Sequence, residues 1–329
     1  MKRKCGILLI AAMLCTMFTA CGKDDGMTKV QLTEVAHSIF YAPMYVAIEE
    51  GYFEEEGIEL TLVNGLGADK TMTAVLSGEA EIGFMGSEAS VYVYNEGAED
   101  YVVNFAQLTQ RAGNFLVSRE KEDDFQMTDL KGKTVLGGRK GGMPQMVFEY
   151  ILKKYGMNPD TDLNIITNID FGMTAQAFAG GSGEYTVEFE PSATALEKEG
   201  NGYVVSSLGV ESGYVPYTAF SAKKSYIEEN PEVIEGFVKA LQKGMDYVNT
   251  HTPEEIAKVI QPQFAETDMD TLVTIVTRYY DQDSWKENLV FEEEAFTLLL
   301  DILESAGELE KRPPYEDLVD NTYAKEAAK

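Results

Sequence analysis

Short apolar runs alternate with amphipathic helical patterns along most of this chain. Apolar stretches of strand length include 29–35, 58–63, 80–85, 101–107 and 115–118. Between them, helices are expected at 43–51, where a proline lies near the start and a glycine ends the run, and at 70–77. This alternation is typical of α/β architecture and not of a disordered chain.

A second α/β unit follows a charged break at 120–125. Its expected strands are 134–137, 163–167 and 185–190, and its expected helices are 145–155 and 173–179. The run 217–222 is expected to be a strand that returns to the first unit. From residue 225 the apolar spacing becomes helical, at 231–249, 253–260, 269–280 and 292–307, and a polar tail from residue 313 is expected to wrap the surface.

These patterns predict two lobes, one of them built from both ends of the chain. We expect residues 28–118 and 218–329 to form the first lobe and residues 119–217 to form an inserted second lobe. The crossings near 118–125 and 213–217 would act as a two-strand hinge that lets the lobes close on a ligand.

The first 20 residues predict an export signal followed by a lipid anchor. Lys2, Arg3 and Lys4 precede an apolar run from Cys5 to Phe18, and small residues lead to Cys21. The segment resembles a bacterial lipobox, in which the cysteine becomes the acylated first residue, and 21–27 would be a tether. An ordinary cleaved signal is one alternative. A transmembrane helix is another, although the apolar run is shorter than the roughly 20 residues that span a bilayer. We therefore expect the protein on the outer face of the cell membrane.

Charge and cysteine content exclude several classes of function. The chain carries 27 basic and 55 acidic residues, a net charge of −28, and loss of the three basic leader residues would leave about −31. Such a chain repels nucleic acid and anionic lipid, so membrane attachment requires the covalent anchor. Cys5 and Cys15 lie inside the leader, so the mature chain has no pair for a disulfide, no cysteine cluster for a metal and no cysteine nucleophile. We expect a monomer without a cofactor.

Four segments, in order along the chain, resemble one family of transport proteins. They are FYAPMYVAIEEGYFEEEGI at 40–58, AVLSGEAEIGF at 74–84, DLKGKTVL at 129–136 and NPEVIEGF at 230–237. The chain resembles the ABC-importer substrate-binding proteins of the nitrate, sulfonate, taurine and thiamine-pyrimidine group. The resemblance implies a type II periplasmic-binding-protein fold, a small-molecule ligand, and an ABC permease with its ATPase subunit as partners.

Candidate ligand residues follow from the rule that ligands bind beyond the carboxyl ends of the strands of an open α/β sheet. Aromatic stacking, hydrogen-bond acceptors and a helix N-terminus near Gly-rich backbone would suit a small, flat, polar solute. The candidates are His37, Phe40, Tyr41, Ser87, Glu88, Gln107, Gln110, Arg139, Gly141, Gly142, Glu188, Glu190 and Tyr217.

Several candidates also have a structural interpretation. Phe40 could pack in the core, Ser87 could cap the next helix, and Arg139 with Lys140 could be a solvated basic pair. Glu188 and Glu190, which alternation places on one side of a strand, could form a solvent-facing edge.

The ligand itself stays open. Thiamine-pyrimidine binders carry a DWTPNTNH-like segment where this chain has EVAHSIF at 34–40, so only the place of a histidine matches. Pyrimidines, flavins, sulfonates and nitrate all remain candidates.

Two other function classes are weaker. The chain resembles thiamine pyrimidine synthases in fold, but those enzymes use a lysine, a histidine and a cysteine-rich motif. Here Lys70 has no supporting residues, His251 is expected on a surface turn, and the mature chain offers no dyad or triad. An adhesion or scaffold protein would be expected to show repeats and would not need a hinge.

Overall fold

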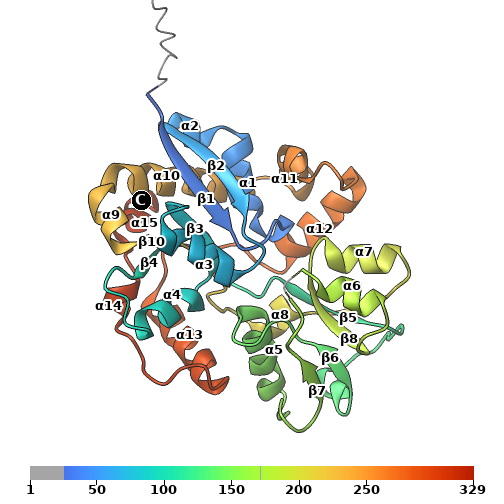
Figure 1. Ribbon diagram of the computed structural model, residues 1–329. Coiled ribbons are helices and arrows are strands. Elements are labelled where there is room, and N and C mark those ends of the chain that lie inside the picture. The colour runs from blue at the N-terminus through green and yellow to red at the C-terminus, as the bar shows by residue number, and fades with distance from the viewer. Residues whose placement is uncertain (1–25, 171) are drawn as a thin grey trace, which may run out of the picture.

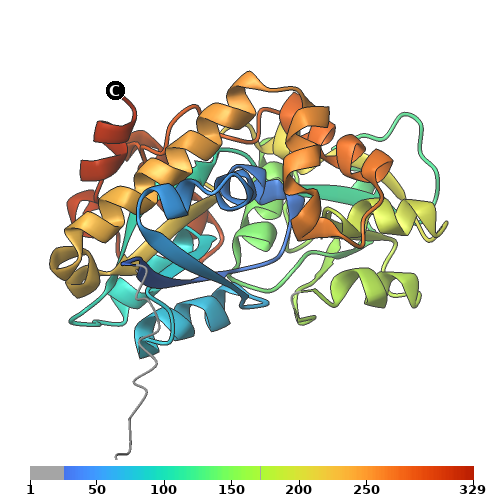
Figure 2. The ribbon, with the colours of Figure 1, turned by 90° about the horizontal axis from the view of Figure 1, so that it is seen from above.

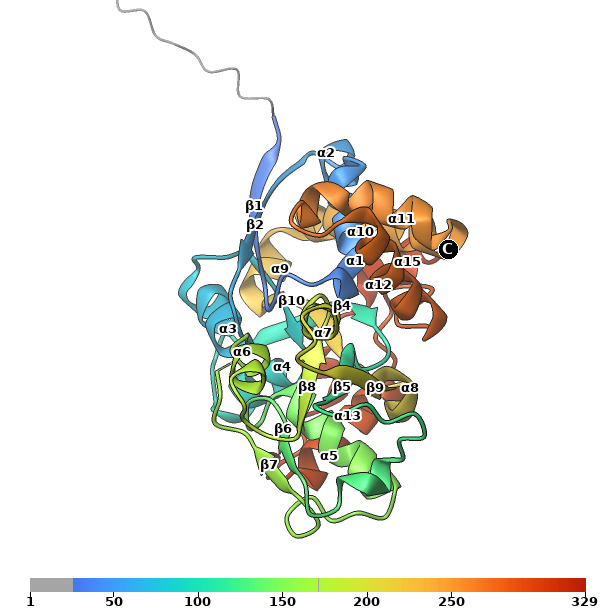
Figure 3. The ribbon, with the colours of Figure 1, turned by 90° about the vertical axis from the view of Figure 1, so that its right-hand side faces the viewer.

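The computed structural model describes residues 26–170 and 172–329, so the leader and Cys21 lie outside the described residues. In this part the chain forms two five-stranded mixed sheets, each with its own helices (Figure 1). The predicted α/β class with two lobes is therefore confirmed. The side view separates them, with β1 and β2 in the upper part and β6 to β8 in the lower part (Figure 3).

The first sheet has the strand order β2-β1-β3-β10-β4. Its strands are β1 (Thr28–Glu34), β2 (Ile58–Asn64), β3 (Ile82–Gly86), β4 (Val102–Thr109) and β10 (Thr218–Lys223). β1 pairs in parallel with β2 and β3, whereas β10 returns from the second lobe and pairs antiparallel with β3 and β4. β3 and β4 are buried along their whole length, which explains their continuous apolar sequence.

Helices cover this sheet on both sides. They are η1 (Ile39–Tyr41), α1 (Ala42–Glu49), α2 (Tyr52–Glu55), α3 (Ala68–Ser77), α4 (Glu88–Asn95), α9 (Lys224–Glu229) and the long α10 (Pro231–Thr250). Figure 2 shows α10 running across the molecule beside α1. The helices approach closely because Gly244 has no side chain: a Cβ there would lie 2.2 Å from the Pro43 carbonyl oxygen.

The second sheet has the order β7-β6-β8-β5-β9. Its strands are β5 (Asn114–Ser118), β6 (Thr134–Leu136), β7 (Asn164–Ile166), β8 (Tyr185–Phe189) and β9 (Tyr203–Ser207). Around them lie η2 (Met127–Leu130), α5 (Met143–Lys154), α6 (Thr174–Ala179), α7 (Ser192–Lys198) and α8 (Leu208–Ser212).

β5 corrects the expected position of the first crossing. We expected residues up to 118 in the first lobe, but β5 pairs antiparallel with β8 and β9. The chain therefore crosses between the sheets at 110–113, before β5, and returns at about 213–217. The other lobe boundaries stay predictions.

The C-terminal third is helical, as the spacing predicts, and touches both lobes. It contains α11 (Pro253–Ile260), η3 (Gln261–Phe264), α12 (Met269–Asp281), α13 (Glu293–Ser305), α14 (Tyr315–Leu318) and α15 (Thr322–Ala327). α13 packs on α5 of the second lobe, and α14 and α15 pack on β4. The tail is thus partly helical, and it buries Leu318 and Ala324.

Candidate functional site

Three adjoining cavities lie between the two lobes. The inner cavity, of about 40 Å³, is lined by first-lobe residues that include Tyr41 and Glu88, by second-lobe residues that include Met143, and by Tyr217 of the returning crossing. The lateral cavity, of about 170 Å³, lies between the end of β1 and the end of β8. Pro144 and Phe189 line both. The cleft mouth, of about 770 Å³, opens between α4, the turn at 139–141 and residues 308–311.

His37 borders the lateral cavity, but both of its ring nitrogens are engaged. Nδ1 lies 2.8 Å from Glu34 Oε1 and Nε2 lies 2.8 Å from the Gln263 carbonyl oxygen. Because a carbonyl can only accept, Nε2 carries a proton, and the hydrogen bond to Glu34 raises the pKa of His37. The ring also stacks on Phe264, with centroids 4.7 Å apart. His37 therefore fixes the end of β1 and offers a cavity wall, with no free nitrogen.

Phe40 packs in the core and does not form an aromatic floor. Its ring is fully buried against Tyr41, Phe189, Tyr217 and Tyr279. The first crossing makes room for the ring, since a Cβ at Gly113 would lie 2.5 Å from it. Of the two interpretations given for Phe40, the structure favours packing.

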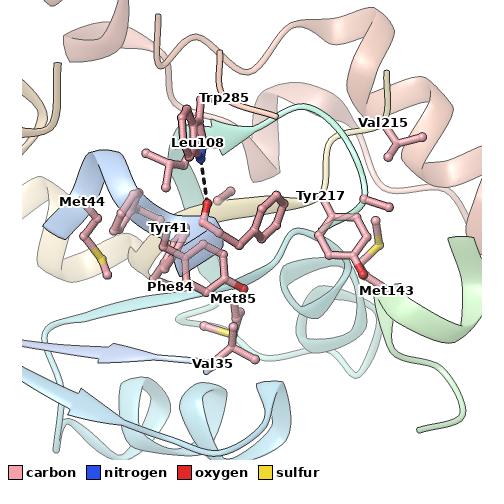
Figure 4. Close-up of a cluster of buried hydrophobic side chains, with 14 of the residues drawn as sticks. Val35, Tyr41, Met44, Phe84, Met85, Leu108, Met143, Val215, Tyr217 and Trp285 are labelled. Carbon is pink, nitrogen blue, oxygen red and sulfur yellow. Dashed lines mark hydrogen bonds between the residues drawn. The ribbon is translucent and has the colours of Figure 1, made fainter. Parts of the chain in front are cut away.

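Tyr41 and Tyr217 line the inner cavity as expected, and Figure 4 shows both rings within a cluster of buried side chains. Burial raises the pKa of each phenol, so both remain neutral. Tyr217 donates its hydroxyl proton to Asn114 Oδ1, which ties the returning crossing to the start of β5.

Ser87 does not cap α4, contrary to its expected structural role. Its hydroxyl instead donates to the Pro216 carbonyl oxygen at 2.6 Å, and its side chain is fully buried. Glu88 is the first residue of α4, and its Oε1 accepts a hydrogen bond from Met143 N–H. Burial raises the pKa of Glu88 to about 7.

The Gly-rich turn offers fewer free amides than expected. Gly141 N–H donates to Gln145 Oε1 and Gly142 N–H donates to the Arg139 carbonyl oxygen. The Arg139 side chain lines the inner cavity and the cleft mouth, and lies 4.0 Å from Asp69 across the cleft. Arg139 is thus placed to meet a ligand, while Gly141 and Gly142 shape the backbone.

Glu188 and Glu190 have different surroundings although both border the lateral cavity. Glu188 accepts a hydrogen bond from the Thr186 hydroxyl at 2.6 Å, and burial raises its pKa to about 7. Glu190 bonds to Thr194 through both oxygens and lies 2.6 Å from Arg278. Glu188 is therefore the better candidate to accept a hydrogen bond from a ligand. Neither residue forms a solvent-facing edge.

Gln107 and Gln110 lie away from the three cavities. The segment after α12 covers the end of β4. Gln107 N–H donates to the Leu289 carbonyl oxygen, and the Gln110 side-chain amide donates to the Trp285 carbonyl oxygen. The indole of Trp285 in turn donates to the Phe40 carbonyl oxygen at 2.8 Å (Figure 4). A segment remote in sequence thus shields this strand end, so we leave both glutamines out of the proposed site.

Asn114 is a cavity residue that the sequence reasoning missed. Its side chain is 1% exposed and lines the lateral cavity, and its Nδ2 has no hydrogen-bond partner in the described part of the chain. A polar residue between a glycine and an apolar strand was the available signal.

Direct contacts join the lobes across the cleft. Ser38 Oγ donates to the Glu190 carbonyl oxygen at 2.8 Å. The Tyr92 hydroxyl donates to the Gly141 carbonyl oxygen, also at 2.8 Å. Met143 N–H, at the start of α5, donates to Glu88 Oε1 at 3.3 Å. The structure therefore shows the lobes in contact.

Neither a metal site nor a membrane-spanning helix is found within the described ranges. No group of three or more His, Cys, Asp or Glu side chains there is arranged to hold a metal ion. No helix in residues 26–170 and 172–329 combines the length and apolar character needed to cross a bilayer.

Comparison with known proteins identifies the family. The family described as NMT1/THI5 like matches residues 39–256. The chain belongs to this family. It is 47% identical over 305 residues to a Bacillus subtilis protein named "Putative binding protein YtlA", covering 93% of this chain and 91% of YtlA. The predicted family is therefore confirmed.

One more distant sequence relative and one structurally similar protein also match this chain. The 4-amino-5-hydroxymethyl-2-methylpyrimidine phosphate synthase of Candida albicans is 25% identical over 253 residues, 70% of each chain. The alkanesulfonate-binding protein SsuA of Xanthomonas axonopodis, solved with MOPS bound, superimposes with a TM-score of 0.72 at 14% identity, covering 89% of this chain and 98% of SsuA. The predicted type II periplasmic-binding-protein fold is confirmed by this likeness.

Proposed function

We propose that this protein is the extracytoplasmic, lipid-anchored substrate-binding component of an ABC importer. It captures a small polar solute between its lobes and delivers it to a membrane permease that a separate ATPase subunit drives. The observation that carries the proposal is the set of cavities lined jointly by both lobes, which two crossings connect in the described part of the chain, at 110–113 and 213–217. The likeness to YtlA, whose name describes a binding protein, supports the same conclusion.

The two crossings provide the motion that capture requires. Opening needs changes in a few backbone dihedral angles at the crossings and the loss of the hydrogen bonds and ion pairs between the lobes, which include those of Arg278 with Glu190 and Glu197. A solute that contacts both lobes binds the closed form better than the open form, and this difference in affinity drives closure. A permease that recognises the closed pair of lobes would then receive loaded protein in preference to empty protein.

An enzymatic function is the alternative, because the family includes a pyrimidine phosphate synthase. The geometry gives it little support. Both ring nitrogens of His37 are engaged, and Lys70 is exposed on α3 and is not among the residues that line the three cavities. The residues that line the cavities are suited to holding a solute by hydrogen bonds and shape.

A ligand screen tests the proposal. The chain lacking residues 1–21 is mixed with pyrimidines, flavins, sulfonates, nitrate and polyamines, and its thermal unfolding is followed. A solute at about 100 times its dissociation constant adds about 2.7 kcal/mol to the free energy of unfolding. The bound solute is then recovered and weighed by mass spectrometry. A solute returned unchanged supports a binder, whereas a converted solute supports an enzyme. If no compound raises the melting temperature, the proposal fails.

A further inference from the structure

Two helix N-termini, one from each lobe, meet at the inner cavity. α4 begins at Glu88 in the first lobe, and α5 begins at Met143 in the second. The first turn of a helix has backbone N–H groups without partners inside the helix, and the helix dipole adds partial positive charge there. Two such ends that face one point would make a binding position for an anion.

The carboxylate of Glu88 occupies that position. Glu88 is the first residue of α4, and its Oε1 accepts a hydrogen bond from Met143 N–H, at 3.3 Å, at the start of α5. The side chain lies over the bare Cα of Gly86, where a Cβ would come within 2.0 Å of Glu88 Oε2. The Gly86-Ser87-Glu88 segment therefore places a negative charge of the protein where the anionic group of a ligand would bind.

One oxygen of this carboxylate is still available. Glu88 is 2% exposed and lines the inner cavity, and its Oε2 has no hydrogen-bond partner among the described residues. A buried acceptor without a donor costs free energy, and a ligand that supplies the donor recovers it. The nearby guanidinium of Arg139 forms its ion pair with Asp69, not with Glu88.

The lateral cavity also favours a ligand that donates hydrogen bonds. Glu188 is a second buried carboxylate, and its recorded hydrogen bond within the described part of the chain comes from a neutral hydroxyl group, that of Thr186. No cation within ion-pair distance of Glu88 or Glu188 is recorded in the described part of the chain. An anionic solute would meet these two acidic side chains as well as Arg139, which also lines the inner cavity, whereas a solute with N–H groups or a positive charge would satisfy both carboxylates.

We propose that Glu88 is a specificity-determining residue that fills the anion position between α4 and α5, so that the cleft takes N–H-donating or cationic solutes and rejects sulfonates, nitrate and carboxylates. This inference rests on the proposed function, because it names the class of solute for the same cleft. It differs from that function in a measurable way, since removal of Glu88 should uncover the anion position whatever the natural solute is.

The test compares anion binding by four forms of the chain lacking residues 1–21. These are the wild type, Glu88→Ala, Glu88→Gln, and the control Glu294→Gln, which removes an exposed carboxylate on α13 outside the three cavities. Methanesulfonate binding is measured by isothermal titration calorimetry at pH 8, and thermal melts establish that each variant is folded. We expect no saturable binding by the wild type or Glu294→Gln. Glu88→Ala should bind at least tenfold more tightly than the wild type, and Glu88→Gln, which keeps the shape but not the charge, should bind with intermediate affinity.

Two results would overturn the inference. One is methanesulfonate binding by the wild type as tight as that by Glu88→Ala, which would leave the proposed solute-binding function intact. The other is no binding by any of the four forms, which would show that the helix ends do not form an anion position. Failure of the proposed function would be recognised separately, as an absence of any stabilising compound in the wider screen of the wild type. If Glu88→Ala does not fold, the isosteric Glu88→Gln alone decides between these outcomes.

Discussion

At the scale of single residues, the cleft contains carboxylate side chains that folding buries. Glu88 and Glu188 are almost fully buried, and burial raises the pKa of each to about 7. A buried carboxylate without a cationic partner is costly to ionise, so the empty protein retains protons that an unfolded chain would release. These two side chains therefore couple the stability of the empty protein to pH, and the same feature suits them to receive a donor from a ligand.

We expect the free energy of unfolding to fall as pH rises from about 4.5 to above 7. In that window the folded chain, with the raised pKa values, binds more protons than the unfolded chain, so raising the pH favours unfolding. Glu88→Gln and Glu188→Gln should each remove up to about 3 kcal/mol of this dependence. Urea unfolding at pH 5 and pH 8 measures it, with Glu310→Gln as the control that keeps the wild-type slope. Identical pH dependence in all four proteins would contradict the assignment.

At the scale of elements, α12 is the brace between the C-terminal region and the second lobe. Its Arg278 lies 2.6 Å from Glu190 and 3.0 Å from Glu197, and it also donates to the Thr194 hydroxyl at 3.0 Å. One turn of helix thus holds the loop after β8 and the helix α7 together. Tyr279 adds to this brace, because its hydroxyl donates to the Gly113 carbonyl oxygen in the first crossing at 3.0 Å.

Replacement of Arg278 by Met should destabilise the protein by about 3 kcal/mol, because it leaves the buried carboxylate of Glu190 without its cation. The matched control is Arg312→Met. Arg312 also pairs with two acids, Asp301 and Glu304, but all three side chains are solvent-exposed, so we expect a loss below about 1 kcal/mol. Chemical denaturation at pH 7 gives both values. Equal losses for the two variants would show that the α12 brace is no stronger than a surface ion pair.

At the scale of the whole molecule, the proposed lipid anchor would complement the charge. A chain without the expected leader would carry about −31 and would be repelled by anionic membrane lipids, so under the proposed function a covalent link would hold it beside a permease. The tether expected at 21–27 ends where β1 begins, on the first lobe. In this proposed arrangement the anchor would attach to the first lobe, and movement of the second lobe would require release of the contacts that α12 makes with it.

Acylation at Cys21 is tested by metabolic labelling with a labelled fatty acid in a bacterial host. The wild type should incorporate the label, and Cys21→Ser should not, because the acylated thiol is removed. Cys15→Ser is the matched control: Cys15 lies within the expected leader, so its replacement should leave the incorporation unchanged. Label that persists in Cys21→Ser, or that is absent from the wild type, would contradict the lipoprotein prediction.

The sequence by itself determined the features that depend on neighbours along the chain. Apolar runs and helical spacing predicted most strands and long helices, such as β1 and α10, since each element buries one face whatever its partner is. The rule of strand ends likewise directed attention to Glu88 and Glu188, which both line cavities. The family segments located the fold for the same reason, because they encode turns and helix ends.

Tertiary structure alone decided the features that depend on distant partners. β5 has an apolar pattern that would suit either sheet, and only pairing with β8 and β9, from later in the chain, assigned it to the second. Gln107 and Gln110 follow the strand-end rule, yet the segment around Trp285 covers them. Glu88 is a candidate ligand residue by its place after β3, but its surroundings depend on α5 of the other lobe, which brings Met143 N–H to its carboxylate. A side chain's chemistry is local, but what remains available for a ligand depends on every group that the fold brings to it.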